Sequence, residues 1–193
     1  MQSLKTITPV DLAMHKAQTQ FCQLVKARFP NYFVGKSVLD VGSYNVNGDN
    51  RHLFEKCEYL GIDVAAGPNV DRVIRAHELD YSDASFDVII STECFEHDMH
   101  YRESLQTLSR ILKSKGLLLF TCATEGRKSH GTRKKNPQDS PGTVQQGGAW
   151  ADYYRNLTEA DIHAAIDVAE IFVIFEFTVN PVMYDLYFWG IKR

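Results

Sequence analysis

An apolar run that leads into an acid and a glycine-containing loop is the strongest chemical signal in the sequence. The segment VLDVGSYNVNG covers residues 38–48, and its apolar start is typical of a buried strand. In a tight turn after such a strand, Gly42 lets the backbone approach a ligand closely. Gly48 can adopt backbone dihedral angles that residues with a side chain rarely adopt. The pattern predicts a strand, a ligand-cradling loop and then a helix. A plain turn between a strand and a helix is the alternative.

A second acid, Asp63, lies at the sequence distance from the first loop that is typical of nucleotide-binding sites. The run EYLGID ends in Asp63, about 20 residues beyond Gly42, the distance at which α/β nucleotide sites place an acid on ribose hydroxyls. By itself a lone aspartate at a strand end is as readily a helix cap. Together with Gly42 it predicts one ligand held by two neighbouring strands.

Three further polar side chains, Glu93, Glu96 and His97, follow the apolar run at 87–92. Open α/β sheets bind ligands at the carboxyl ends of their strands. His97 is the candidate catalytic residue, because a histidine near its ordinary pKa can accept a proton at cellular pH. A structural histidine that bonds the next helix is the alternative.

The elements that must position these residues follow from apolar periodicity. Continuous apolar runs predict strands buried on both faces, as in parallel sheets, at 37–42, 58–63, 70–74, 87–92 and 117–122. An apolar stripe over 101–112 predicts a helix between the last two. A helix is also expected from Thr8 to Pro30, and another after Leu157, with Thr158 as its cap. The runs at 171–179 and 183–193 predict two antiparallel strands at a sheet edge.

The segment 124–150 is rich in glycine, proline and cations and predicts a lid-like substrate loop. Its cations would attract an anionic acceptor, although a solvated flexible loop explains them equally. The candidate substrate contacts in and after this loop are His130, Arg133 and Tyr153.

Composition narrows the function classes. The chain has 193 residues, 44% of them hydrophobic and 23% charged, with a net charge of -3. This balance predicts one globular domain over 1–193 and disfavours a protein that coats nucleic acid. The four cysteines show no metal-type spacing, so no metal site is predicted. No apolar run is long enough to span a bilayer, which predicts a cytoplasmic protein without a membrane partner.

In order and spacing, VLDVGSYNVNG, YLGIDV, HELDYSDASFDVIISTECFEH and SRILKSKGLLLFT resemble the motifs of class I S-adenosylmethionine-dependent methyltransferases. The resemblance covers roughly 36–123. More narrowly, GSYNVNG, FEHD, HGTRK and YYRNLT are similar to a type-11-like group of small bacterial and phage methyltransferases, mostly of unassigned substrate. The family implies an α/β fold, a Rossmann-like three-layer sandwich. Its seven-stranded, mostly parallel sheet would end in an antiparallel C-terminal edge hairpin, with 1–35 as an N-terminal helical segment.

The resemblance also implies a set of site residues. S-adenosyl-L-methionine, which leaves as S-adenosyl-L-homocysteine, would be bound by Asp40, Gly42, Ser43, Tyr44, Asn47, Gly48, Asp63, Val64, Ala76, His77, Glu78 and Glu93. Within this set, 76–78 would border the adenine. This chain departs from the family at Arg75, where an acid often contacts the adenine amino group, and it lacks the commoner alternating glycines of the first loop.

The expected activity is methyl transfer to an acceptor that is a small molecule or glycan precursor. Transfer from a sulfonium depends mainly on alignment and exclusion of water, so a dedicated base is not required. A non-catalytic S-adenosylmethionine-binding module and a nicotinamide-nucleotide-dependent oxidoreductase are the alternatives. Oligomeric state and acceptor atom are not indicated by any motif.

Overall fold

The structure is a computed structural model that describes the backbone of residues 9–193 and the side chains from residue 16 onward. The predicted cap at Thr8 therefore lies outside the described residues. A seven-stranded sheet forms the centre, in the order β3-β2-β1-β4-β5-β7-β6. Its strands are β1 (Ser37–Val41), β2 (Glu58–Asp63), β3 (Arg72–Val73), β4 (Phe86–Thr92), β5 (Leu112–Ala123), β6 (Phe172–Asn180) and β7 (Asp185–Lys192).

The first five strands run parallel, and β7 is antiparallel to both β5 and β6. The predicted mostly parallel sheet with an antiparallel C-terminal edge hairpin is therefore confirmed. Parallel strands all point in the same direction, so their carboxyl ends lie at the same edge of the sheet. That edge receives the chain segments that carry the candidate site.

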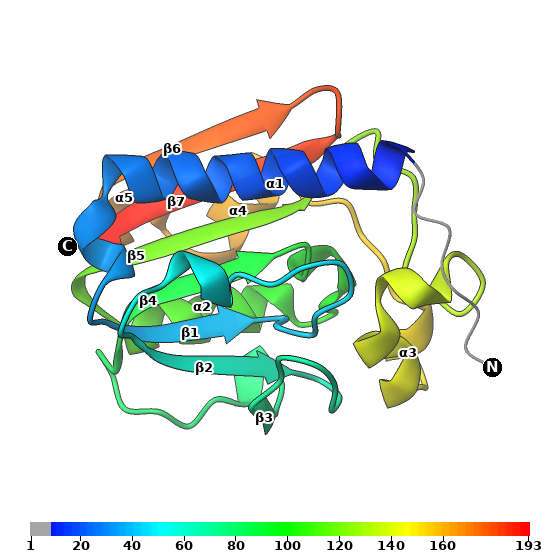
Figure 1. Ribbon diagram of the computed structural model, residues 1–193, viewed down its shortest axis with the longest axis horizontal. Helices are drawn as coiled ribbons and strands as arrows, with labels where there is room; N and C mark the ends of the chain where they lie inside the picture. The colour runs from blue at the N-terminus through cyan, green and yellow to red at the C-terminus, as the bar shows by residue number, and fades with distance from the viewer. Residues whose placement is uncertain (1–8) are drawn as a thin grey trace.

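Helices cover both faces of the sheet, as Figure 1 shows. The long helix α1 (Pro9–Arg28) lies across the front face, over β5 and β7. The helices α2 (Tyr101–Ile111), α4 (Glu159–Ala165) and α5 (Val168–Ile171) pack on the opposite face. The predicted three-layer α/β sandwich is thus present.

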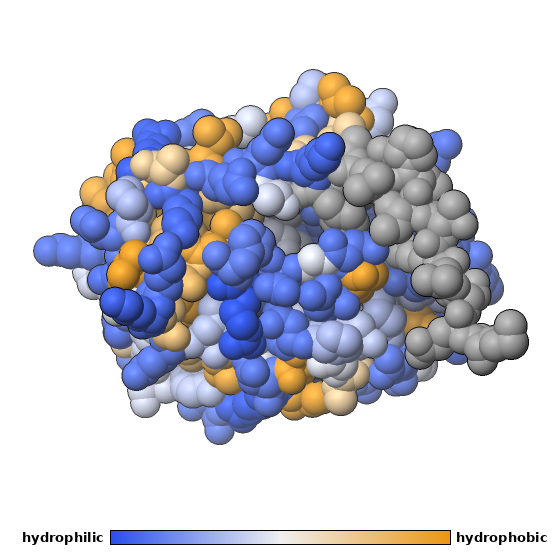
Figure 2. Space-filling model, viewed as in Figure 1, coloured by the Kyte–Doolittle hydropathy of each residue, from blue (hydrophilic) through white to orange (hydrophobic). Residues whose placement is uncertain are grey.

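Two hydrophobic clusters fill the space between the layers. Successive strand residues point to opposite faces, so Val88 joins the cluster under α1 and Ile89 the cluster under α2. On the α1 side, Val25 and Trp189 complete the contact. The exposed side chains over this face are mostly hydrophilic with scattered apolar ones, which is ordinary for a protein surface (Figure 2).

The prediction of a helix after the first loop is wrong. Between β1 and β2 the chain forms only a short 3-10 turn, η2 (Arg51–Leu53). Side chains in the loop bond to nearby backbone groups: Asn45 Oδ1 accepts from the Gly48 amide at 2.9 Å, and Asp49 Oδ1 from the Arg51 amide at 3.0 Å. Such local bonds compete with helix formation.

The other predicted elements agree with the structure, with two differences in length. The third strand is reduced to the two residues of β3, and β5 already begins at Leu112, directly after α2. At the start of α4, Thr158 accepts from the Asp161 amide while Asp161 accepts from the Thr158 amide, which is the predicted capping box.

The segment 124–150 is a folded cover over the carboxyl ends of the strands (Figure 1). It contains η5 (Pro137–Asp139) and α3 (Pro141–Gln146), and η6 (Trp150–Asp152) begins at its end. Backbone bonds hold it in place, for example from the Arg133 amide to the Ala151 carbonyl at 2.8 Å. No helix among the described residues combines the length and apolar character needed to cross a membrane.

Candidate active site

A pocket opens at the carboxyl ends of β1, β2 and β4 and is closed on one side by the lid segment 124–150. Most of the residues predicted from the sequence line it. They are Asp40, Gly42, Ser43, Tyr44, Asn47, Gly48, Asp63, Val64, Ala76, Glu93, His97 and His130. The short loop after each strand brings these side chains together, although they come from five separate stretches of sequence.

Two predicted cofactor residues, His77 and Glu78 of η3 (Ala76–Glu78), are not among the lining residues. The His77 ring packs on the His100 ring with centroids 4.2 Å apart. Glu78 accepts from Arg75 Nη1 at 2.8 Å. Arg75 itself lines the pocket, so the side chain that faces the ligand space here is the cation rather than either predicted neighbour.

Two of the predicted substrate residues, Arg133 and Tyr153, also lie outside the pocket lining. Arg133 forms an exposed ion pair with Asp152. The sequence suggested one cationic patch over the lid, but Arg127 points inward and is nearly buried. The lid cations therefore do not form a single surface.

Further lining residues, contributed by α1, the lid and several loops, were not predicted from the sequence. Chief among them are Gln18, Asn50, Arg75, Thr92, Cys94, Asp98, Arg127, Ser140, Gly142, Thr143 and Trp150. Thr92 and Cys94 flank the predicted Glu93, so position after a strand end could have identified them. No spacing pattern connects the lid residues to the sheet edge.

Asp40 lies at the floor of the pocket and is almost completely buried. Tyr59 Oη donates to Asp40 Oδ2 at 2.5 Å, and Asn50 Nδ2 donates to Oδ1 at 3.3 Å. Burial nevertheless dominates and raises the pKa of the Asp40 carboxyl to about 6.

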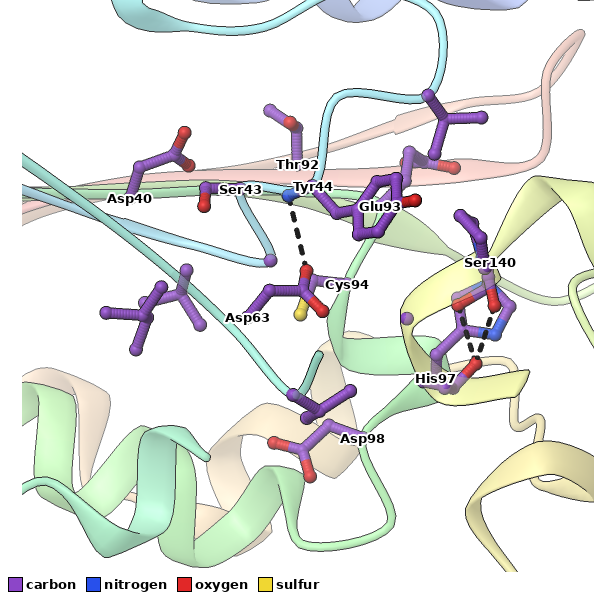
Figure 3. A pocket seen from close by; sticks show the side chains of 18 of the residues that line it. Asp40, Ser43, Tyr44, Asp63, Thr92, Glu93, Cys94, His97, Asp98 and Ser140 are labelled. Atoms are coloured by element: carbon purple, nitrogen blue, oxygen red, sulfur yellow. Dashed lines mark hydrogen bonds between the residues drawn. The ribbon is translucent and has the colours of Figure 1, made fainter. Parts of the chain in front are cut away.

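Asp63 ends β2 on the other side of the first loop, as Figure 3 shows. Its carboxylate accepts from the backbone amides of Tyr44 at 3.3 Å and Ala65 at 3.4 Å. Burial raises its pKa above the ordinary value, and the backbone amides act in the opposite direction. The carboxylate reaches into the pocket from the same strand edge as Asp40.

The lid rests directly on the rim of this pocket. A Cβ on Gly142 would lie 2.3 Å from Asp63 Oδ1, so the two residues are in close contact. With its amide oriented to satisfy both neighbours, Gln146 donates to the Val64 carbonyl at 3.0 Å and accepts from Arg75 Nη2 at 2.9 Å. The guanidinium of Arg75 also lies 5.5 Å from the Trp150 ring centroid.

A largely buried ionic group, centred on Arg127, forms part of the pocket wall. Its guanidinium pairs with Asp185 and lies 3.6 Å from Glu93 Oε2. Glu93 has a positive φ of 51° at the turn out of β4, and Thr121 Oγ1 donates to its Oε1 at 3.0 Å. Burial and the nearby Glu96 carboxylate raise the pKa of Glu93 well above its usual range.

His97 lies beside the lid, next to Ser140 and apart from Asp40 and Asp63 (Figure 3). Its ring meets the rings of His130 and Tyr154 edge to face, at centroid distances of 5.2 and 5.4 Å. Burial lowers the pKa of His97 to about 3, so the ring is neutral at cellular pH. The arrangement places a neutral imidazole at the lid end of the pocket.

Comparison with known proteins agrees with this architecture. Residues 13–157 match a family described as a methyltransferase domain. A methyltransferase from Aquifex aeolicus described as S-adenosylmethionine-dependent has a similar fold, with a TM-score of 0.61, 16% identity, and coverage of 97% of this chain and 95% of that one. No curated protein matches the sequence.

Two similar structures contain S-adenosylhomocysteine. The 1,6-didemethyltoxoflavin-N1-methyltransferase of Burkholderia thailandensis has a TM-score of 0.60 and 16% identity, over 90% of this chain and 76% of that one. The phosphoethanolamine N-methyltransferase 2 of Haemonchus contortus, also bound to phosphomonomethylethanolamine, has a TM-score of 0.59 and 16% identity. In that case the similarity covers 90% of this chain and 52% of the longer relative. At these identities the likeness establishes a shared fold.

Proposed function

The chain belongs to the methyltransferase-domain family, and from that premise we propose that it transfers a methyl group from S-adenosylmethionine to a small-molecule or glycan-precursor acceptor. The observation that carries the proposal is the half-buried Asp63 carboxylate at the end of β2, beside the loop after β1. Two relatives with the same fold hold S-adenosylhomocysteine.

The pocket residues fit this cofactor. Asp63 offers carboxylate oxygens, which suit the two hydroxyls of a ribose. Asp40 offers a second, buried carboxyl, which suits the ammonium group of a methionine moiety. Gly42, with φ of 78°, turns the chain out of β1, and a Cβ there would lie 2.6 Å from Cys94 Sγ. A larger residue would therefore push the loop and Cys94 apart.

When bound, the cofactor supplies an activated methyl group on a sulfonium. The chain's own residues then have two tasks, alignment and exclusion of water. The lid contacts Asp63 through Gly142 and Arg75 through Gln146, which closes the rim over the cofactor pocket. His97 lies at the acceptor end of the pocket, but burial lowers its pKa to about 3, so the imidazole is a weak base and the transfer relies on alignment rather than on proton removal by this ring.

The acceptor side lies at the lid end of the pocket, bordered by His97 and His130. Arg127 also reaches this wall, but two carboxylates, Glu93 and Asp185, offset its charge. Arg133 is likewise paired with Asp152. This charge balance supports an acceptor that is uncharged where it contacts the lid end of the pocket. The cations of segment 124–150 therefore no longer favour an anionic acceptor.

The decisive test is calorimetric titration of the purified chain with S-adenosylhomocysteine and, in parallel, with a nicotinamide dinucleotide. We expect stoichiometric binding of S-adenosylhomocysteine that weakens roughly 10- to 100-fold in Asp63→Asn, because charge-assisted hydrogen bonds contribute about 1.5–3 kcal/mol. Asp83→Asn is the matched control, since Asp83 makes an exposed ion pair with Arg110.

Each outcome separates the alternatives. Absence of S-adenosylhomocysteine binding contradicts the proposal, and preference for the dinucleotide indicates an oxidoreductase. Binding of S-adenosylhomocysteine followed by a screen of acceptors with radiolabelled S-adenosylmethionine then separates an enzyme from a binding module. Methylated product that disappears in Asp63→Asn supports transfer.

A further inference from the structure

A second chemical site adjoins the pocket, formed by Glu96, His97 and His130. Each residue offers one ligand atom, a carboxylate oxygen or an imidazole nitrogen, and these atoms all lie within 4.8 Å of one another. Glu96 and His97 come from η4 (Phe95–His97), directly after β4, whereas His130 comes from the lid. The fold of the lid brings these donors together across 33 residues of sequence, counted from His97 to His130.

The donors are buried without the partners that buried polar groups normally have. Glu96 has an exposed fraction of 0% and His97 of 4%. Within the described part of the chain, neither carboxylate oxygen of Glu96 nor Nδ1 of His97 has a hydrogen-bond partner. Native proteins rarely leave such atoms unsatisfied, because a buried polar group without a partner loses the hydrogen bonds that it would make with water. The Glu96 carboxylate and the two imidazoles together form a donor set that suits a cation.

The carboxyl groups around this cluster also favour a bound cation. Two buried carboxyl groups, Glu96 and Asp185, and the partly buried Glu93 lie near the guanidinium of Arg127, the one cation that pairs with any of them among the described residues. Arg127 is already in contact with Asp185 and close to Glu93. A cation bound at Glu96 would pair with a buried carboxyl group that has no hydrogen-bond partner among the described residues.

We propose that Glu96, His97 and His130 bind a divalent transition-metal ion. Two imidazoles and one carboxylate form a ligand set that suits first-row ions such as Mn²⁺, Fe²⁺ and Zn²⁺ and leaves further coordination positions open. His130 Nδ1 lies 3.1 Å from the Lys128 carbonyl, a contact that fixes the tautomer and leaves Nε2 free to bind the ion.

The position of the site indicates that a bound ion would contact the acceptor. His97 and His130 line the pocket at its lid end, and Glu96 lies beneath them. An ion held there faces the acceptor side, where it can bind an acceptor oxygen or nitrogen and lower the pKa of that group. In this arrangement His97 is a metal ligand, and the ion activates the acceptor. The inference rests on the donor geometry and not on methyl transfer.

The test uses the untagged chain, stripped with a chelator and dialysed, and then titrated calorimetrically with MnCl₂, ZnCl₂ and MgCl₂. We expect about one equivalent of Mn²⁺ or Zn²⁺ to bind more tightly than Mg²⁺, which prefers oxygen ligands. Glu96→Gln and His130→Gln should each weaken binding at least tenfold. His163→Gln is the control, because His163 also faces a carboxylate, Glu159 at 3.6 Å, but on the surface of α4.

Circular dichroism of each variant shows that the fold is retained. Absence of stoichiometric binding overturns the inference, as does binding that both Glu96→Gln and His130→Gln leave unchanged or that His163→Gln weakens equally. Metal titration and S-adenosylhomocysteine titration are separate measurements. Either site can therefore be disproved while the other stands.

Discussion

Gly142 of the lid lies against the carboxylate of Asp63, so close that a Cβ on Gly142 would stand 2.3 Å from Asp63 Oδ1. The constraint is one of space, because Gly142 is absent from the residues with positive φ. A residue of the lid thus touches the acid that we propose binds the cofactor ribose. This contact couples the position of the lid to the occupancy of the pocket.

Gly142→Ala tests that coupling. The added methyl group collides with the Asp63 carboxylate, which backbone amides hold in place, so we expect α3 to move off the rim. S-adenosylhomocysteine affinity should fall by roughly tenfold, equivalent to about 1.4 kcal/mol. Calorimetry measures the affinity, and limited proteolysis measures exposure of the lid.

Gln145→Ala is the control for this substitution, because Gln145 is exposed on the same short helix. It should bind S-adenosylhomocysteine as the unaltered chain does. Equal affinity of Gly142→Ala and Gln145→Ala would show that the lid does not depend on contact with Asp63.

Asp40 predicts a pH dependence of stability. Burial raises its pKa from 3.8 in the unfolded chain to about 6 in the folded one. The folded state therefore binds the proton more tightly, so its contribution is greatest below pH 4 and is lost as the pH rises to about 6. A shift of about two pKa units corresponds to about 3 kcal/mol.

Urea unfolding of the unaltered chain and of Asp40→Asn at several pH values between 4 and 8 measures this effect. The stability of the unaltered chain relative to the variant should decline between pH 4 and pH 6 and then stay level. A constant difference across the range would mean that Asp40 titrates normally in the folded protein.

Much of the fold was readable from the sequence because the strands are buried on both faces. Val38 and Leu39 point to opposite clusters and are both fully buried, so β1 appears as a continuous apolar run. The helix expected after Gly48 was wrong because Asn45 and Asp49 bond locally to backbone amides. Helix propensity and the spacing of apolar residues do not show that side-chain hydrogen bonds compete with helix formation here.

The sheet side of the site was also predictable, because strand ends are fixed by the same apolar runs. Asp40 and Asp63 lie near the carboxyl ends of two of those runs, His97 comes shortly after a third, and all of them line the pocket. The lid side was not predictable, since contacts such as Gly142 with Asp63 join segments without any shared periodicity. The approach of His130 to His97 likewise depends on how the lid folds.

Thr158→Ala tests the cap of α4, which leads the chain away from the lid. The Thr158 side chain accepts from the Asp161 amide at 3.3 Å, and its loss leaves a helix donor without that partner. We expect destabilisation by about 1 kcal/mol, measured by urea unfolding. Thr19→Ala is the control, because Thr19 is exposed on α1, where alanine is the better helix former. A loss as large in Thr19→Ala would contradict the capping role.

The buried Arg127 predicts the largest single effect on stability. Arg127→Met keeps the length of the side chain but removes the cation that pairs with Asp185 and lies beside Glu93. Asp185 then remains buried, and Glu93 partly buried, without that charge, and breaking a buried ion pair in this way costs roughly 3–5 kcal/mol. Urea unfolding should show this loss.

Arg133→Met provides the comparison within the same lid. Its partner Asp152 is exposed, as is Arg133 itself, so water replaces the lost contact and the expected change is below about 1 kcal/mol. A similar small change in Arg127→Met would show that Glu93 and Asp185 take up protons or water without penalty. In that event the carboxyl groups beside Glu96 carry no charge that a bound cation would offset, and only the unsatisfied atoms of Glu96 and His97 support the proposed metal site.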